Sequence, residues 1–112
     1  MENFKQIVYR HSDQALMIIP QNDAIQVVPR FIFDLTADQQ VIFNELEVFC
    51  LTQKDPLVYV VYTADVNRLD IQGSNDEVVC LSVSEMSPED KAIVDRVGVI
   101  CTELINPLYT QI

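Results

Sequence analysis

The chain has 112 residues, of which 49% are hydrophobic, and its 17 acidic and 7 basic residues give a formal net charge of −10. This length fits a single compact domain over residues 1–112, and the apolar content disfavours disorder. Seven basic residues cannot form a broad phosphate-binding surface, so direct binding to nucleic acid or to an anionic membrane is disfavoured.

The first part of the chain predicts short strands. The segments KQIVYR and ALMIIP flank the polar segment HSDQ, as the two strands of a hairpin would. Pro29 interrupts the next apolar segment, AIQVVPRFIFDL. Because a proline cannot donate to a strand ladder, this strand is predicted to lie at an edge, to be bulged, or to start after Pro29.

Residues 37–51 fit either a helix or a strand. Thr36 and Gln39 have the spacing of a capping box. A helix would place on one side the apolar residues Ile42, Phe43, Leu46, Phe49 and Cys50. A strand would alternate apolar and acidic residues between positions 45 and 50. The pattern favours the helix.

Residues 57–62, LVYVVY, are all apolar and predict a central strand, because neither face of such a strand suits water. If 37–51 is a helix, two helices are available and could cover both faces of this strand. If 37–51 is a strand, one face stays open and needs a partner. The segments RLDIQ and EVVCLSVS, joined by GSND, then predict a second hairpin.

Residues 88–105 form the clearest helix. Ser87 can cap it, and its apolar residues fill one continuous arc at helical spacing. Gly98 is expected to allow close packing on the sheet, while Val99 projects alone from the polar side. Pro107 is predicted to end the helix, because the residue before a proline avoids helical conformation.

These elements predict an α+β fold. We expect a mainly antiparallel sheet of five or six short strands, with helix 88–105 packed on it and a second helix at 37–51. No internal repeat is evident.

The three cysteines, Cys50, Cys80 and Cys101, are far apart and lack CxxC spacing, which argues against a disulfide scaffold or a zinc site. Reduced thiols indicate an intracellular, cytoplasmic protein. The N-terminal segment MENFKQ is not typical of a signal peptide, and no apolar run approaches the roughly 20 residues of a membrane helix.

No catalytic or cofactor-binding motif stands out. His11 is the only histidine, and the string HSD at 11–13 fits a turn better than a catalytic triad. Asp65, Asn67 and Asp70 offer oxygen ligands, but their segment lacks the register of a calcium loop. The sequence therefore predicts no metal and no cofactor, and it favours a protein that is not an enzyme.

Partner binding is the favoured function. The residues assigned to a partner surface are Tyr59, Tyr62, Val99, Leu108 and Tyr109. We expect a non-enzymatic interaction or assembly subunit that binds a protein partner or forms a homo-oligomer. In composition it is similar to small viral, phage or bacterial accessory proteins. The alternatives are an acidic nucleic-acid mimic that inhibits a basic DNA- or RNA-binding protein, and a small enzyme with carboxylate or thiol chemistry.

Overall fold

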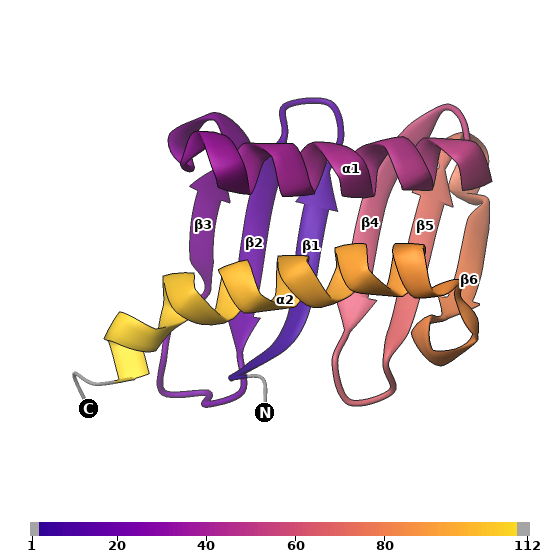
Figure 1. Cartoon of the computed structure of the whole chain (residues 1–112). Helices are drawn as coiled ribbons and strands as arrows, with labels where there is room; N and C mark the ends of the chain where they lie inside the picture. Colours follow the sequence, from indigo (N-terminus) through magenta and orange to yellow (C-terminus); the bar gives the residue numbers. More distant parts are fainter. Residues whose placement is uncertain (1–2, 110–112) are drawn as a thin grey trace.

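The computed structural model describes residues 3–109 and contains one sheet of six antiparallel strands (Figure 1). The strands are β1 (Phe4–Arg10), β2 (Ala15–Pro20), β3 (Val28–Phe31), β4 (Leu57–Thr63), β5 (Arg68–Gly73) and β6 (Val78–Ser82). Their order across the sheet is β3-β2-β1-β4-β5-β6. Two helices, α1 (Ala37–Gln53) and α2 (Pro88–Tyr109), complete the α+β fold that the sequence predicts.

The strand predictions are confirmed. The apolar segment LVYVVY lies in β4, which pairs with β1 on one side and β5 on the other. The first predicted hairpin is β1–β2 and the second is β5–β6. Pro29 lies within β3 at the edge of the sheet, opposite Met17 of β2, which is the first of the three arrangements its sequence allows.

Both helices lie on the same face of the sheet and run across its strands (Figure 1). α1 contacts β4, α2 contacts β1 and β2, and the two helices contact each other. The hydrophobic core therefore lies between the helix layer and one face of the sheet. The expectation that two helices would cover both faces of LVYVVY is wrong, because the chain leaves β3 and β6 toward the same side.

Helix α1 confirms the helical interpretation of 37–51 and extends to Gln53. The Thr36 hydroxyl accepts a hydrogen bond from the Gln39 N–H at 3.2 Å, and the Gln39 side chain accepts one from the Thr36 N–H at 3.1 Å. This capping box satisfies two of the backbone groups that a helix start leaves unpaired.

Helix α2 starts at Pro88, as predicted, and the Ser87 hydroxyl accepts a hydrogen bond from the Asp90 N–H at 3.2 Å. Its C-terminus differs from the prediction, because the helix continues through Pro107 to Tyr109 instead of ending near residue 105.

Contacts of Tyr109 stabilise this extra turn. The Tyr109 hydroxyl donates to the carbonyl oxygen of Asn3 at 2.6 Å and accepts from the N–H of Asn22 at 3.1 Å. These tertiary hydrogen bonds outweigh the local preference of a residue that precedes a proline.

The two halves of the chain share an order of elements: three strands, a short 3-10 turn and a long helix, and the second half has one additional 3-10 turn, Ser74–Asp76, between β5 and β6. The first unit ends with α1 and the second with α2, and β1 and β4 meet at the centre of the sheet. The burial pattern from Phe4 to Tyr9 is repeated, position by position, from Leu57 to Tyr62. Both strands also have a register shift at the same point. An approximate twofold axis between β1 and β4 therefore relates the two units.

Details of the turns repeat as well. Gln14 and Asn67 end equivalent hairpin turns with positive φ values of 55° and 49°. The carbonyl oxygen of Gln14 accepts from the Ile32 N–H at 3.1 Å, and that of Asn67 accepts from the Val83 N–H at 3.0 Å. The expectation of no internal repeat is thus wrong at the level of structure. Identical residues at corresponding positions include the pairs Tyr9 and Tyr62, Leu16 and Leu69, Ile18 and Ile71, and Cys50 and Cys101.

The two glycines differ in what a side chain would meet. At Gly98 a Cβ atom would lie 3.8 Å from Cζ of Phe4, which is ordinary contact, so Gly98 faces the sheet but an alanine would also fit. At Gly73 a Cβ atom would lie 2.6 Å from Cγ and Cε of Lys54 and 3.1 Å from the carbonyl oxygen of Pro56.

We expect Gly98→Ala to raise the free energy of unfolding by up to about 1 kcal/mol, because alanine is favoured over glycine within a helix. Gly73→Ala is expected to lower it by about 1–3 kcal/mol, because the Pro56 backbone restricts relaxation around an added methyl group. Urea unfolding followed by circular dichroism measures both values. A change of the same sign in both variants would contradict this assignment of the two glycines.

Candidate functional site

The face of the sheet opposite the helices is not covered by any described helix (Figure 1). Strand pairing places side chains of four neighbouring strands in one row across this face: Pro29, Met17, Val8 and Val61. Met17 is 44% exposed, and Val8 and Val61 are half-buried by their neighbours in the sheet. We call these four residues the apolar row. An uncovered row of this kind is typical of a contact surface.

Aromatic side chains lie next to the apolar row. Phe31, at the end of β3, is 41% exposed and its ring stacks on that of Phe33 with 5.2 Å between centroids. Tyr59 lies on the same face of β4, paired with Arg10 of β1 and half-buried. The uncovered face therefore combines aliphatic and aromatic surface over β1 to β4.

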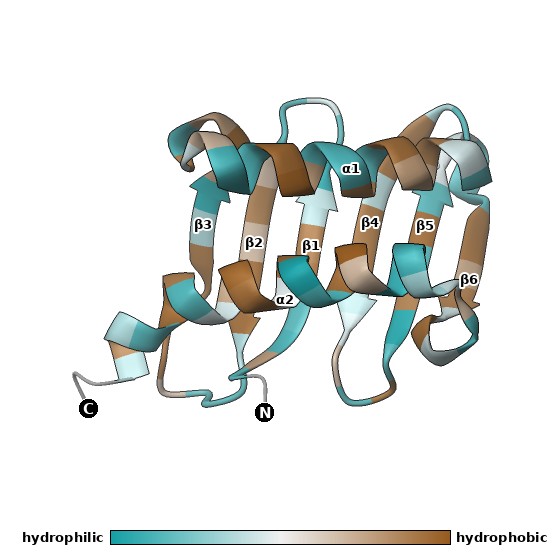
Figure 2. Ribbon diagram, viewed as in Figure 1, coloured by the Kyte–Doolittle hydropathy of each residue, from teal (hydrophilic) through white to brown (hydrophobic). Residues whose placement is uncertain are grey.

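Charge is unevenly distributed between the two sides of the molecule. Helices α1 and α2 together carry seven acidic and two basic residues. Figure 2 shows hydrophilic residues spread along both helices. The strand positions that face away from the helices carry Arg10, Arg68 and Asp70 as their charged residues. Although the chain is strongly acidic, its uncovered sheet face has no excess of negative charge.

On the helix side, Glu47 of α1 joins two residues of the first hairpin. One carboxylate oxygen accepts a hydrogen bond from the Tyr9 hydroxyl, and the other lies 3.0 Å from Nδ1 of His11. Burial and the Glu47 carboxylate raise the pKa of Tyr9 above its ordinary value, so the phenol remains a hydrogen-bond donor. Because the carboxylate accepts the hydrogen bond of the Tyr9 hydroxyl, this cluster has the character of a structural link between α1 and β1.

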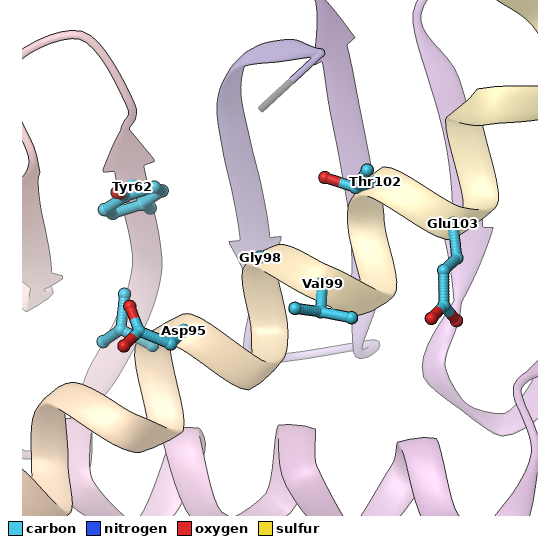
Figure 3. Close-up of a pocket in the computed structure, with 7 residues that line it drawn as sticks. Tyr62, Asp95, Gly98, Val99, Thr102 and Glu103 are labelled. Carbon is cyan, nitrogen blue, oxygen red and sulfur yellow. The ribbon is translucent and has the colours of Figure 1, made fainter. Parts of the chain in front are cut away.

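A pocket of about 480 Å³ lies between α2 and the side chain of Tyr62 (Figure 3). Its lining residues are Tyr62, Val94, Asp95, Gly98, Val99, Thr102 and Glu103. The Tyr62 hydroxyl donates to Oδ1 of Asn67 at 2.8 Å. Within residues 3–109, neither Asp95 nor Glu103 takes part in an ion pair. The pocket therefore combines an aromatic wall with two uncompensated carboxylates.

The structure separates the five residues assigned to a partner surface. Tyr59 lies on the uncovered sheet face, whereas Tyr62 and Val99 line the pocket beside α2. Leu108 and Tyr109 lie in the last turn of α2, half-buried, and Tyr109 holds the beginning of β1 through its hydroxyl. No single surface contains all five residues.

Several residues of the uncovered face were missed by the sequence analysis. Val8 and Met17 lie in predicted strands, and the alternation within these strands indicates a side chain of each on the face opposite the buried residues. In the sequence, Val8 lies between Ile7 and Tyr9. In the structure, these two neighbours are buried, with exposed fractions of 3% and 2%. The missing information is which face the helices cover.

The cysteines are free, as expected: none of the three forms a disulfide. Cys50 and Cys101 are buried at corresponding positions of α1 and α2, and Cys80 is exposed on β6. Burial raises the pKa of the Cys50 thiol to about 12 and that of Cys101 in the same direction. Such thiols are unreactive as nucleophiles near neutral pH.

The other candidate groups have local partners. Asp13 pairs with Arg10, which donates from Nε at 2.8 Å and from Nη2 at 2.6 Å, so the HSD string forms no triad. Asp70 pairs with Arg68 at 3.1 Å. Within the described part of the chain, no group of three or more His, Cys, Asp or Glu side chains is placed to hold a metal ion.

No helix between residues 3 and 109 is both long and apolar enough to cross a membrane.

Comparisons of this chain with protein-family models, with curated proteins and with solved structures gave no match.

Proposed function

We propose that this protein is an assembly subunit that pairs with a second copy of itself through the uncovered face of its sheet. The observation that carries the proposal is the position of both helices on one face, which leaves the apolar row on the other. Two such faces would pack at about 10 Å, as in other sheet sandwiches, and bury both apolar rows. The resulting dimer has helices on its two outer sides.

The charge distribution favours a second copy as the occupant. Two chains with a net charge of −10 repel each other, and the repulsion is weakest where negative charge is least dense. The uncovered face carries two arginines and one aspartate, and pairing through it keeps the acidic helices of both copies far apart. Tyr59 and Phe31 add aromatic area of the kind that is enriched at interfaces.

Light scattering after size-exclusion chromatography tests the proposal. We expect the wild-type chain to have twice the monomer mass of 12.8 kDa. Val8→Lys and Met17→Lys each make the net charge less negative, yet each would bury an unpaired ammonium group in the interface, because their cross-strand neighbours are apolar. That burial costs about 3–5 kcal/mol, which weakens the dimer by more than about 100-fold. Both variants are therefore expected to be monomeric.

Val48→Lys is the matched control, because it makes the same change of charge at a valine that is 55% exposed on α1. This variant should remain a dimer. Met17 is the more exposed of the two tested positions, so its variant separates loss of pairing from loss of folding, which circular dichroism monitors. A wild-type monomer at every concentration and salt level would contradict self-association, as would a Met17→Lys variant that is folded and dimeric.

A further inference from the structure

Equivalent positions of the two units are filled differently. In the first unit, the side chains of Glu47 and His11 lie beside Tyr9. At the corresponding positions of the second unit, Gly98 takes the place of Glu47, Ala64 that of His11 and Tyr62 that of Tyr9. The second unit keeps the tyrosine but lacks both the carboxylate and the imidazole that accompany it in the first. The first unit also has a pocket beside its tyrosine, of about 390 Å³, but Glu47 lines that pocket, whereas Gly98 takes this position in the pocket beside α2.

Packing does not explain the glycine at position 98. A Cβ atom there would make only an ordinary contact with Phe4, so the fold accepts alanine, which a helix prefers. Glycine leaves open the space beside Tyr62 that a larger side chain at this position would narrow. Gly98 lies in the middle of the pocket, between Asp95 and Thr102 (Figure 3).

The lining of the pocket defines the charge of its ligand. Asp95 and Glu103 supply two carboxylates that have no ion-pair partner within the described residues, and Thr102 supplies a hydroxyl. No lysine or arginine lines the pocket. The Tyr62 ring forms an aromatic wall, and aromatic rings attract ammonium and guanidinium groups.

We propose that this pocket binds an organic ammonium or guanidinium group carried on a short apolar stem. Val94 and Val99 provide apolar contact for the stem, while Asp95 accepts hydrogen bonds from the cationic group. Glu103 lies about 12 Å further along the helix and adds negative charge to the rim of the pocket. The volume of about 480 Å³ lies within the range of small-ligand sites in proteins. The same chemistry is presented by a free small amine and by a lysine or arginine side chain of another protein.

Titration of the ¹⁵N-labelled chain with n-butylammonium chloride, observed by two-dimensional NMR at constant ionic strength, tests the site. We expect saturable shifts of the amide signals of Gly98, Val99 and Thr102. The neutral isostere 1-butanol should bind roughly three- to tenfold more weakly, because it makes no ionic contact with Asp95. Shifts of equal size with 1-butanol, or no saturable shift with the ammonium ion, would overturn the proposal.

Variants locate the binding. Asp95→Asn is expected to weaken the ammonium complex by roughly three- to tenfold, and Gly98→Gln should abolish it by filling the pocket. The control is Asp38→Asn, which removes a charge from an exposed position of α1 outside the pocket and should leave binding unchanged. Equal weakening in Asp38→Asn and Asp95→Asn would show a general charge effect and overturn the site.

The source of the ligand is resolved by a second probe, N-acetyl-lysine methylamide. Tighter binding of this blocked lysine than of n-butylammonium supports the pocket as a receptor for a protein side chain. Tighter binding of n-butylammonium supports a free amine as ligand. Neither result depends on the oligomeric state, so experiments can contradict ligand binding in the pocket without contradicting the dimer, and the reverse.

Discussion

Replacing Phe43 by alanine is expected to lower the free energy of unfolding by about 3–5 kcal/mol, and both halves of the molecule should then unfold together. Phe43 is 2% exposed on α1, and its ring lies 6.5 Å from that of Tyr9 on β1. Truncation to a methyl group would leave a cavity between helix and sheet. The repeat does not divide the core, because β1 pairs with β4 and α1 contacts α2.

Urea unfolding observed through the ring signals of Tyr9 and Tyr62 measures this effect, because these tyrosines report on the first and the second unit. Their midpoints should coincide in the wild type and shift together in Phe43→Ala. Val41→Ala is the matched control on the same helix, since Val41 is 57% exposed, and it should change stability by less than about 0.5 kcal/mol. Tyr62 signals that stay native while those of Tyr9 are lost would show that the two units are independent domains.

Local signals in the sequence predicted most of the elements correctly. The capping box of Thr36 and Gln39 and the cap at Ser87 are short-range features, and both appear in the structure. Pro29 limited its strand to three predicted arrangements, because proline has no backbone N–H to donate to a neighbouring strand. The end of α2 was predicted wrongly, since the hydrogen bonds of Tyr109 to Asn3 and Asn22 join residues that are distant in the sequence.

The side of the sheet that each helix covers was beyond the sequence analysis. Periodicity shows that a helix has an apolar side, but it does not show which face of the sheet receives that side. The patterns of LVYVVY and of the two helices are therefore equally compatible with one helix on each face and with both helices on one face. In the structure, Val60 and Tyr62 face the helices, whereas Tyr59 and Val61 face away from them.

The repeat and the pocket also needed the structure. Few residues match between the two units, and the connection from β2 to β3 differs in length from that between β5 and β6. The relation of Glu47 to Gly98 becomes visible only after the helices are aligned by their caps at Thr36 and Ser87. The exchange of Glu47 for Gly98 in the pocket is therefore seen only when the two halves of the molecule are compared.

Glu47→Ala is expected to lower the free energy of unfolding by about 1–3 kcal/mol, because it removes the acceptor of a buried phenol and the partner of His11. Tyr9→Phe removes the donor and leaves the Glu47 carboxylate in place. The double variant should be less destabilised than the sum of the two single variants, by about 0.5 kcal/mol or more. Chemical unfolding of the four proteins of this cycle provides the measurement.

Glu45→Ala is the control for the cycle, because Glu45 lies on the same helix and pairs with Arg96 at 3.5 Å on the exposed surface. Its loss should cost less than about 1 kcal/mol. Additive effects of Tyr9→Phe and Glu47→Ala would show that the hydrogen bond contributes little. A coupled result would mean that the hydrogen bond between Tyr9 and Glu47 links α1 to β1. The second unit has no counterpart of this link, because Gly98 occupies the position of Glu47, and the pocket beside Tyr62 therefore has no carboxylate at that position.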